Sequence, residues 1–408
     1  MEKFSMNTKK NKSGVLVGIT GGIAAFKLAE VVSALVKKGI DVQVIMTENA
    51  TQFIGEETFS ALTGKRVYKD LFSSFSEGRI LHVEFSGNYK IFLIAPATAN
   101  IIGKIAHGIA DDFITTTCLG FSPDNVVIAP AMNTRMYENP MVQENIRKLK
   151  DKGYKFIEPE SGILACKEEG KGRLADWKVI VDYVEQLLEE TKDYKGKKVL
   201  VSAGPTRESI DPVRFITNRS SGKMGYAIAK RARDRGADVI LVSGPTSIEP
   251  PYGIDVIWVE SAVDMYNEIV NQVTDVDIFI SAAAVSDFRP ADYVDKKIKK
   301  EAKDEVVLRL IRNPDILKEV SMKKKKEQIF VGFSAETHDL LENAKKKMNE
   351  KNLDLIVANK IGKKGSGFEA DTNKISIIDR EGNITVYPLL TKDKVADIIL
   401  SKALEVIS

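Results

Sequence analysis

Short runs of apolar residues, many of them β-branched, alternate with longer amphipathic stretches along the first half of the chain. Runs at 15–19 and 42–46 enclose an amphipathic stretch at 23–38, and later runs lie at 91–95 and 126–129. Apolar runs of this kind are typical of strands buried on both faces, and their alternation with helical stretches predicts a parallel sheet with helices on both sides. The first half is therefore predicted to be an α/β domain.

The same pattern returns in the second half after a polar break at 188–198. The later apolar runs and helical stretches lie at 199–202, 224–235, 239–242, 276–281, 329–333, 336–352 and 355–358. The break predicts a domain boundary near residue 190. We expect a polar tail at 1–13, one α/β domain at 14–190 and a second, Rossmann-like α/β domain at 191–408.

Composition narrows the class of protein. The 408 residues are 43% hydrophobic and 29% charged, which is ordinary for a globular protein. Sixty Lys and Arg against 57 Asp and Glu leave a net charge of +3, without the one-signed field typical of nucleic-acid or membrane-surface binding. No long apolar run or signal peptide is present, and two cysteines, Cys118 and Cys166, make no disulfide framework. We expect a cytoplasmic protein that acts on small molecules.

Two glycine-rich turns are candidates for phosphate binding. The first predicted strand leads into Gly-Ile-Thr-Gly-Gly-Ile-Ala at 18–24, and the second domain opens with Val-Ser-Ala-Gly-Pro-Thr-Arg at 201–207. Backbone N–H groups at the start of a helix are suited to a phosphate. The first turn is not G-x-G-x-x-G, and Thr47 rather than an acidic residue follows the next strand. A hydroxyl there favours a monophosphate over an adenosine ribose.

The sequence has only three histidines, and one of them lies in a segment of interest. Of His82, His107 and His338, His82 lies in Ile-Leu-His-Val-Glu just before a predicted buried strand. A neutral imidazole there can act as a base near neutral pH, although a lone histidine is more often structural. Its neighbours favour the functional interpretation, because three distinctive segments follow successive strand ends: Ala-Pro-Ala-Thr-Ala-Asn at 95–100, Ala-Pro-Ala-Met-Asn-Thr-Arg-Met at 129–136 and Gly-Ile-Leu-Ala-Cys at 162–166.

These segments make the first half resemble the flavin-dependent cysteine decarboxylases. The second half resembles the phosphopantothenate–cysteine ligases in several motifs: Ala-Gly-Pro-Thr-Arg-Glu at 203–208, Asp-Pro-Val-Arg at 211–214, Thr-Asn-Arg-Ser-Ser-Gly-Lys-Met-Gly at 217–225, Ala-Ala-Ala-Val-Ser-Asp at 282–287 and Lys-Ile-Lys-Lys at 297–300. The resemblance covers nearly the whole chain after residue 14, in the domain order of the bifunctional bacterial coenzyme A biosynthesis family. Two unrelated activities in one known order argue against a chance likeness.

For the first half, the resemblance implies a flavodoxin-like fold that binds FMN. In the reaction that the resemblance implies, FMN would take a hydride equivalent from the thiol-bearing carbon to give a thioaldehyde, loss of CO₂ would give an enethiolate, and the reduced flavin would return the electrons. His82 would assist oxidation and decarboxylation, Asn133 would hold the substrate carboxylate, and Cys166 would donate a proton. The resemblance assigns FMN contacts to Gly21, Gly22, Ala24, Thr47, Thr98, Asn100 and Met132.

The chain departs from the decarboxylase pattern directly after the predicted proton donor. The family usually has glycine there, whereas this sequence has Lys167, on a loop expected to act as a flap. A cation at that position would lower the Cys166 pKa or change the mobility of the flap. The other cysteine, Cys118, is flanked by Thr117 and Leu119 and is predicted to be a packed core side chain.

For the second half, the resemblance implies CTP-dependent ligation through an acyl-cytidylate, with Mg²⁺ or Mn²⁺. Lys297 would stabilise the phosphoryl-transfer transition state, and Asn218 would shield or orient the acyl-cytidylate. The predicted CTP contacts, besides Lys297, are Asp287, Asn313, Pro314, Asp315, Ile316, Phe333, Lys347 and Lys351. No residues are predicted as metal ligands.

The resemblance also implies an assembly. A flavin site shared within trimers and a ligase dimer near 220–225 combine into a homo-dodecamer, with His82 or Asn133 acting across an interface. Two other functions explain parts of the pattern. An NAD-dependent two-domain oxidoreductase is disfavoured by the absent G-x-G-x-x-G and ribose-binding acid. A non-enzymatic flavin-binding regulator of the halotolerance type is disfavoured because His82, Asn133 and Cys166 are all present.

Overall fold

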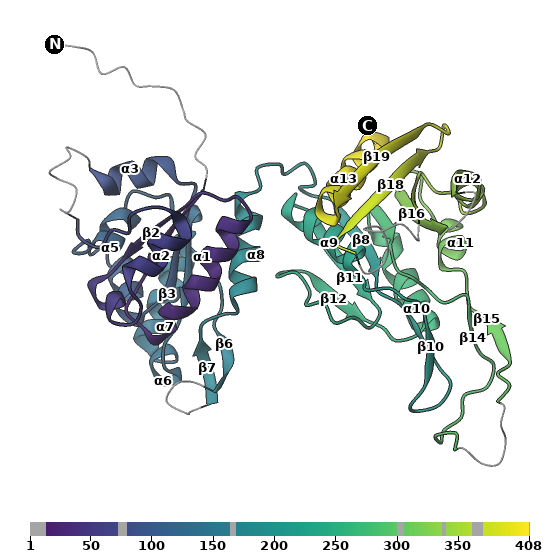
Figure 1. Ribbon diagram of the computed structural model, residues 1–408, viewed down its shortest axis with the longest axis horizontal. Coiled ribbons are helices and arrows are strands. Elements are labelled where there is room, and N and C mark those ends of the chain that lie inside the picture. The colour runs from purple at the N-terminus through teal and green to yellow at the C-terminus, as the bar shows by residue number, and fades with distance from the viewer. Residues whose placement is uncertain are drawn as a thin grey trace, which may run out of the picture. The chain divides into compact units, whose positions relative to one another are not determined.

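The computed structural model describes residues 14–71, 80–163, 169–299, 306–336, 340–360 and 370–407. It divides into two compact units, Met1–Glu190 and Thr191–Ser408 (Figure 1). Within the described parts of the chain, no helix has the length and apolar character needed to cross a membrane.

The first unit is built on a five-stranded parallel sheet. Its strands are β1 (Val15–Ile19), β2 (Val42–Met46), β3 (Ile91–Ala97), β4 (Val126–Pro130) and β5 (Lys155–Phe156). They lie in the order β2-β1-β3-β4-β5, and every pair is parallel. The predicted parallel α/β fold is confirmed, and this strand order is that of flavodoxin-like sheets.

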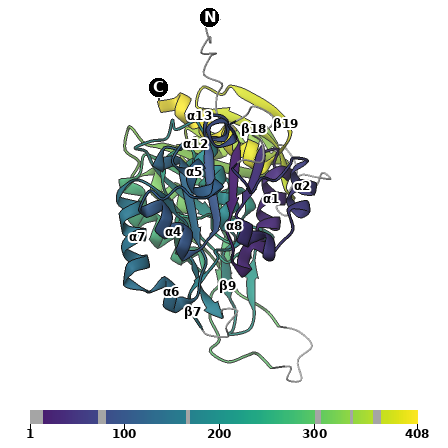
Figure 2. The same ribbon diagram turned by 90° about the vertical axis from the view of Figure 1, so that its left-hand side faces the viewer.

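Helices cover both faces of this sheet (Figure 2). On one face lie α1 (Leu28–Lys37) and α8 (Trp177–Leu188), and on the other lie α3 (Leu81–Asn88), α4 (Ala99–Ala106), α5 (Phe113–Cys118) and α7 (Pro140–Asp151). The remaining elements are η1 (Ile23–Lys27), η2 (Glu48–Gln52), α2 (Glu56–Thr63), η4 (Pro123–Asn125), α6 (Thr134–Tyr137) and the antiparallel hairpin of β6 (Glu160–Ile163) and β7 (Glu169–Arg173).

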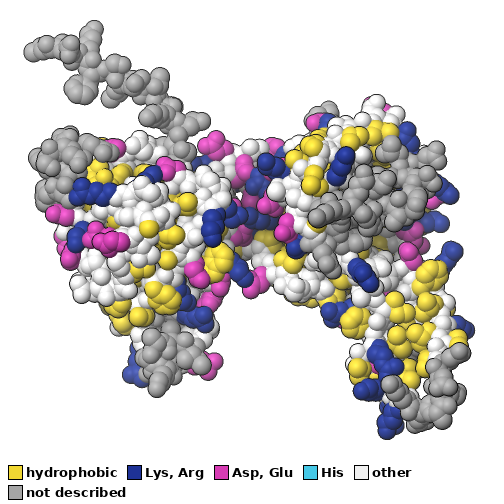
Figure 3. Space-filling view, viewed as in Figure 1, with side chains coloured by type: hydrophobic (Ala, Val, Ile, Leu, Met, Phe, Trp, Pro, Cys, Tyr) yellow, Lys and Arg dark blue, Asp and Glu magenta, His cyan; other side chains and the backbone are white. Residues whose placement is uncertain are grey.

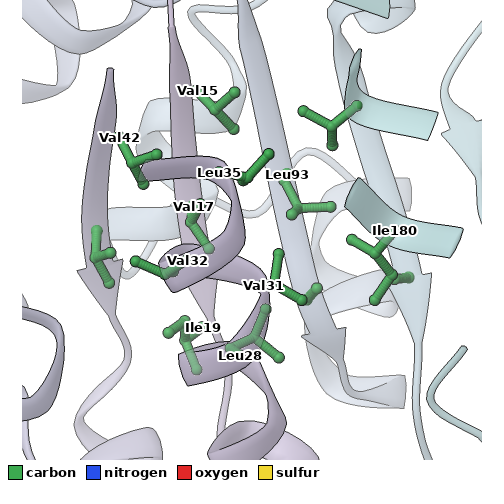
Figure 4. Close-up of a cluster of buried hydrophobic side chains, with 14 of the residues drawn as sticks. Val15, Val17, Ile19, Leu28, Val31, Val32, Leu35, Val42, Leu93 and Ile180 are labelled. Carbon is green, nitrogen blue, oxygen red and sulfur yellow. The ribbon is translucent and has the colours of Figure 1, made fainter. Parts of the chain in front are cut away.

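Helix α1 shows why this half folds as predicted. Its apolar residues Leu28, Val31, Val32 and Leu35 recur at helical spacing and are fully buried. They face Val17, Ile19 and Leu93 on the sheet (Figure 4). The helix expected at 23–38 begins as the 3₁₀ turn η1, so that the chain leaves β1 through a tight turn before the α-helix starts.

The second unit contains a mixed eight-stranded sheet. Its strands are β8 (Lys198–Ala203), β11 (Asp238–Ser243), β12 (Asp255–Trp258), β13 (Ile278–Ser281), β16 (Ile329–Glu336), β17 (Leu355–Lys360), β18 (Thr372–Asp379) and β19 (Ile384–Thr391). The order is β12-β11-β8-β13-β16-β17-β18-β19. The pairs from β12 to β17 are parallel, whereas β18 and β19 are antiparallel additions at one edge.

The helices of this unit again lie on two faces. Helices α9 (Lys223–Asp234) and α13 (Lys392–Ile407) share one apolar cluster with the sheet, and α10 (Ala262–Gln272), α11 (Ile316–Ser321) and α12 (Leu340–Glu350) share the other. The turn η5 (Val273–Asp275) follows α10. Because parallel strands all end at the same edge, the loops that follow β8, β13, β16 and β17 gather there.

Two short antiparallel pairs complete the second unit: β9 (Arg207–Ser209) with β10 (Phe215–Thr217), and β14 (Phe288–Pro290) with β15 (Leu310–Arg312). We call residues 288–299 and 306–312 the arm. Figure 3 shows hydrophobic side chains gathered over β14 and β15. Exposed apolar side chains of the arm are Phe288, Tyr293, Val294, Val306, Val307, Leu308, Leu310 and Ile311. An apolar surface of this extent is typical of an interaction site.

Candidate functional site

The turn after β1 lies where the order of the first sheet reverses, between β1 and β3. Open α/β sheets bind ligands at this point, beyond the carboxyl ends of the strands. Gly22 has an extended backbone and precedes the helical turn η1. A Cβ atom at Gly22 would meet only Thr98 Cγ2, at 3.7 Å, so the backbone of the turn is open on that side. The turn is therefore accessible to a ligand.

Two predicted hydroxyl groups lie at the same edge of the sheet. Thr47 follows β2 and accepts a hydrogen bond from the Ala50 N–H (3.3 Å), and Thr98 follows β3 and accepts one from the Ile101 N–H (3.4 Å). Because a hydroxyl that accepts one bond still has a proton to donate, both suit phosphate oxygens. The open turn and these donors fit a flavin phosphate. The other predicted FMN residues are half-buried Gly21, Ala24 and Met132 and exposed Asn100.

One residue at this edge, Thr20, was not predicted from the sequence. Thr20 Oγ1 donates to the Pro96 carbonyl oxygen (2.6 Å) and accepts from the Thr98 N–H (3.2 Å). It therefore ties the turn to the end of β3. Its only signal in the sequence was a hydroxyl within the turn 18–24.

His82 lies in the first turn of α3, the helix that precedes β3. Leu81 and Phe85 of this helix are buried in the sheet-facing cluster, whereas His82 is half-buried. The predicted flavin contacts instead follow the carboxyl ends of β1, β2, β3 and β4. His82 and these contacts are thus carried by different elements of one protomer.

Asn133 caps α6 in the loop after β4. Its Oδ1 accepts a hydrogen bond from the Arg135 N–H (2.8 Å). Because the side-chain oxygen of Asn133 accepts this backbone hydrogen bond, the NH₂ group of the same amide is the end suited to bind a carboxylate. The predicted role of Asn133 requires that orientation.

The hairpin of β6 and β7 is attached to the same loop. The Met132 N–H donates to the Gly172 carbonyl oxygen (2.9 Å). Gly172 has φ of 147°, and a Cβ atom there would lie 2.3 Å from Met132 O. Only glycine permits this approach. Cys166 and Lys167 lie outside the described residues, between β6 and β7 in the sequence.

Glu158 makes a second attachment of the hairpin. Its carboxylate accepts hydrogen bonds from Lys150 (2.6 Å), Lys171 (3.0 Å) and Tyr137 (3.0 Å). Partial burial by itself raises the pKa of Glu158, but these hydrogen bonds outweigh it and hold the pKa at about 2. The carboxylate therefore joins α6, α7 and β7 as an anion at neutral pH.

Cys118 is buried, as predicted, with 1% of its surface exposed. Burial raises the pKa of its thiol to about 12. Since the thiolate is the reactive form of cysteine, Cys118 is a packing residue rather than a nucleophile.

A cavity of about 580 Å³ opens at the carboxyl edge of the second sheet. Its lining includes eight of the nine residues predicted to bind CTP, and also Asn218: Asp287, Asn313, Pro314, Asp315, Ile316, Phe333, Lys347 and Lys351. Lining residues that the sequence did not single out include Ser220, Lys223, Arg312, Asn359, Asn373 and Lys392. The fold thus assembles one cavity from segments spread over most of this unit.

Hydrogen bonds fix the helix α12 end of the cavity. Lys347 Nζ donates to the Phe333 carbonyl oxygen (2.7 Å), and Lys351 Nζ pairs with Asp315 Oδ1 (3.0 Å). Asp315 also caps α11 by accepting from the Lys318 N–H. Both lysines are therefore held at the wall of the cavity, with their charges close to any ligand inside it.

Asn218 also lines the cavity. Its Nδ2 donates to the carbonyl oxygens of Ala284 (3.2 Å) and Val285 (3.0 Å), which follow β13. The side chain is thereby oriented at the cavity rim.

Among the residues predicted for the ligase site, Lys297 is the exception that does not line this cavity. It lies exposed on the arm. Its neighbour Ile298 is anchored elsewhere, because its N–H donates to Asp211 Oδ2 (3.1 Å) and its carbonyl oxygen accepts from Arg214 Nη2 (2.5 Å). No group of three or more His, Cys, Asp or Glu side chains suited to a metal ion occurs in the parts of the chain that the structure describes.

Comparisons with known proteins agree over the two units. The sequence model of the Flavoprotein family matches residues 3–189, and that of the DNA/pantothenate metabolism flavoprotein C-terminal domain matches residues 194–406. The Coenzyme A biosynthesis bifunctional protein CoaBC of Bacillus subtilis (strain 168) is 47% identical over 395 residues, covering 96% of this chain and 97% of that protein.

A protein of the same name from Vibrio cholerae serotype O1 is 41% identical over 387 residues, covering 95% of this chain and 96% of that protein. Among solved structures, the C-terminal domain of a CoaBC protein is 44% identical, with a TM-score of 0.45, and covers 52% of this chain and 96% of that chain.

Proposed function

Since this chain belongs to the family of bifunctional coenzyme A biosynthesis proteins, we propose that its second unit joins 4′-phosphopantothenate to cysteine and its first unit decarboxylates the product to 4′-phosphopantetheine. The chain is a bifunctional enzyme with ligase and decarboxylase activities. The observation that carries the assignment of the ligase is the single cavity lined by eight predicted nucleotide contacts and Asn218.

In the ligase unit, CTP activates the substrate carboxylate. A carboxylate oxygen attacks the α-phosphorus and pyrophosphate leaves; the amine of cysteine then attacks the acyl carbon, loses a proton, and CMP leaves. Lys347 and Lys351 supply positive charge at the cavity wall, which favours the phosphates and the charge that develops during transfer. We assign Asp287 and the segment 313–316 to the nucleoside. Mg²⁺ would be held chiefly by the substrate phosphates, as is usual for this ion.

To act in ligation, Lys297 would have to reach the cavity of a second copy of the chain. It lies outside the cavity of its own protomer, on an arm whose apolar side chains are exposed. Association of two arms would bury that surface and bring Lys297 to the partner's cavity. This arrangement supports a dimer of the ligase unit, and with a trimer of the flavin unit it gives the dodecamer.

In the decarboxylase unit, we assign FMN to the open turn at Gly22 and to the hydroxyls of Thr47 and Thr98. When bound, FMN supplies reversible acceptance of the electrons removed from the thiol-bearing carbon. Asn133 holds the substrate carboxylate through its NH₂ group, and His82 accepts or returns a proton near the thiol. Cys166, which lies outside the described residues, is assigned as the proton donor to the enethiol.

The two alternative functions leave parts of the molecule without a role. A flavin-binding regulator of the halotolerance type gives no use to the cavity of the second unit. An NAD-dependent oxidoreductase accounts for neither the match to the flavoprotein family nor the motifs of the ligase half.

The two half-reactions can be tested separately. Purified protein should show the visible absorption of oxidised flavin and should release CO₂ from supplied phosphopantothenoylcysteine without CTP. With CTP, Mg²⁺ and 4′-phosphopantothenate, it should release pyrophosphate. Colourless protein that releases no CO₂ after addition of FMN would refute the decarboxylase assignment, and absence of pyrophosphate would refute the ligase assignment.

A further inference from the structure

Two lysines line one end of the ligase cavity, and each is the first residue of a helix. Lys223 begins α9 and Lys392 begins α13. The two helices pack side by side in one apolar cluster. Lys392 is 7% exposed, whereas the side chain of Lys223 is 38% exposed. The structure therefore places a buried ammonium group and a second cation at the same end of the cavity.

Both lysines are at positions where helices favour the opposite charge. The first turn of a helix carries the positive end of the dipole, so Asp and Glu are stabilising there and cations are not. Gly222 precedes α9 without contributing a side-chain cap. Burial lowers the pKa of Lys392 to about 8, and the positive charge of Lys223 acts in the same direction. Two lysines and the starts of two helices therefore meet at this end of the cavity.

Among the described residues, the two carboxylates next to these lysines in the structure or the sequence lie outside the cavity lining. Asp371 pairs with Lys223 (2.6 Å), but its side chain is 87% exposed and it does not line the cavity. Asp393, in the first turn of α13, is also exposed. Among the described lining residues only Asp287 and Asp315 are acidic, and Asp315 already pairs with Lys351.

The remaining groups at this end are neutral hydrogen-bonding residues. Ser220, Asn359 and Asn373 line the cavity there, and Asn373 is 4% exposed. Asn359 Nδ2 lies 3.5 Å from Asn373 Oδ1. Cationic and neutral polar groups without a lining carboxylate suit an anion with several oxygens, as a phosphate has.

We infer that Lys392, together with Lys223, forms a phosphate subsite of the ligase cavity. The inference rests on the proposed ligase function. Helices α9 and α13 lie on one face of the sheet, whereas α11 and α12, beside the segment 313–316, Lys347 and Lys351, lie on the other. The cavity thus spans the edge of the sheet, with nucleoside contacts at one end and the subsite at the other. Two substrates bring phosphate: CTP through its triphosphate, and 4′-phosphopantothenate through its 4′-phosphate.

The test uses the full chain with Lys392→Met and, as a matched control, Lys394→Met. Lys394 is exposed, lies one half-turn further along α13 and does not line the cavity. Binding of inorganic pyrophosphate and of 4′-phosphopantothenate is measured by calorimetry, and KM is measured for CTP, 4′-phosphopantothenate and pantothenate. Loss of a charge-assisted contact predicts at least about tenfold weaker binding in Lys392→Met and no change in Lys394→Met.

The pattern of losses distinguishes the two sources of phosphate. If the triphosphate occupies the subsite, Lys392→Met weakens pyrophosphate binding and raises the KM for CTP, and the preference for 4′-phosphopantothenate over pantothenate is kept. If the 4′-phosphate occupies it, that preference collapses and CTP is unaffected. Wild-type affinity for both phosphate ligands in Lys392→Met would overturn the inference.

A structural role for Lys392 predicts a different result. Methionine replaces a buried charge with an apolar chain of similar length, so a ligand-binding role predicts an unliganded melting temperature equal to or above that of the wild type. A lowered melting temperature with normal ligand affinity would overturn the subsite. If Lys392→Met does not fold, the exposed partner is tested as Lys223→Met against the same criteria. Wild-type protein that binds pyrophosphate but forms no ligation product would refute the proposed function and leave the subsite standing.

Discussion

The backbone N–H of Met132 donates a 2.9 Å hydrogen bond to the carbonyl oxygen of Gly172, and this bond attaches β7 to the loop that carries Asn133. Two segments distant in the sequence, the loop of Asn133 and the strand that follows Cys166 along the chain, thus share one support. Glu158 adds a second support through Lys171 and Tyr137. Decarboxylation should therefore depend on how closely β7 approaches this loop.

Gly172→Ala tests that dependence. The new Cβ atom would lie 2.3 Å from Met132 O, at a φ of 147° that disfavours side chains, so β7 must move away from the loop. We expect CO₂ release to fall by at least about tenfold, as small misplacements of substrate-positioning groups can cause, with flavin still bound. Gly108→Ala is the matched control, because Gly108 also has positive φ but nothing lies within 4 Å of its Cβ position. Equal activity in both variants would contradict the role of this contact.

Much of the fold was accessible from the sequence because continuous apolar runs mark buried parallel strands. β1 and β2 begin and end at the predicted residues. The edge strand β19 was missed because most of its residues are exposed, so it carries no apolar run. The antiparallel pairs of β17 with β18 and of β18 with β19 make the second sheet mixed rather than wholly parallel.

The candidate site was accessible only where its residues form contiguous motifs. Asn313 to Ile316 could be found in this way. Lys392 could not be found in this way, because it joins the site only through the packing of α13 beside α9, which lie far apart in the sequence. Lys297 lies outside the cavity because the arm is anchored at Asp211 and Arg214. No local sequence pattern predicts this anchoring.

Ser286→Ala should not destabilise the protein. Ser286 is 5% exposed, and its Oγ has no hydrogen-bond partner among the described residues. A buried hydroxyl without a partner costs about 1–3 kcal/mol, so its removal should leave the free energy of unfolding equal or higher. Ser202→Ala is the contrasting variant, because Ser202 Oγ accepts from the Ala283 N–H (3.3 Å), and it should lose about 1 kcal/mol. Denaturant unfolding measures both, and the reverse order would show that the Ser286 hydroxyl has a stabilising partner.

Lys392 should make stability depend on pH in a specific direction. Its pKa is lowered from 10.5 to about 8 by burial and by Lys223, against the opposing effect of Asp371. Between those values the unfolded chain binds a proton that the folded chain lacks, so this group's contribution to stability rises with pH. Its destabilising effect is fully present below pH 8.

The gain in unfolding free energy of Lys392→Met over the wild type should therefore be largest below pH 8 and should disappear as pH rises towards 10.5. Denaturant unfolding at about pH 7 and about pH 10 measures the difference. Lys394→Met should show no such dependence. An equal gain at both pH values would mean that the Lys392 ammonium carries no penalty in the folded state.

Lys297 and Asn218 provide a test of the shared ligase site. If Lys297 serves the cavity of a partner and Asn218 serves its own, Lys297→Gln and Asn218→Asp are each inactive in ligation. Mixed oligomers of the two variants should regain about a quarter to a half of the activity, because some cavities then receive both wild-type residues. Co-expression with two affinity tags isolates the mixed species. If its activity does not exceed that of either parent, Lys297 acts within its own protomer or has no role.

The most direct measurement is a single reaction that contains purified full-length protein, 4′-phosphopantothenate, cysteine, CTP and Mg²⁺, analysed by mass spectrometry. The account predicts 4′-phosphopantetheine, with one CMP, one pyrophosphate and one CO₂ released for each molecule formed, and no product when CTP is omitted. Consumption of CTP without ligation, or formation of 4′-phosphopantetheine without CMP, would contradict it.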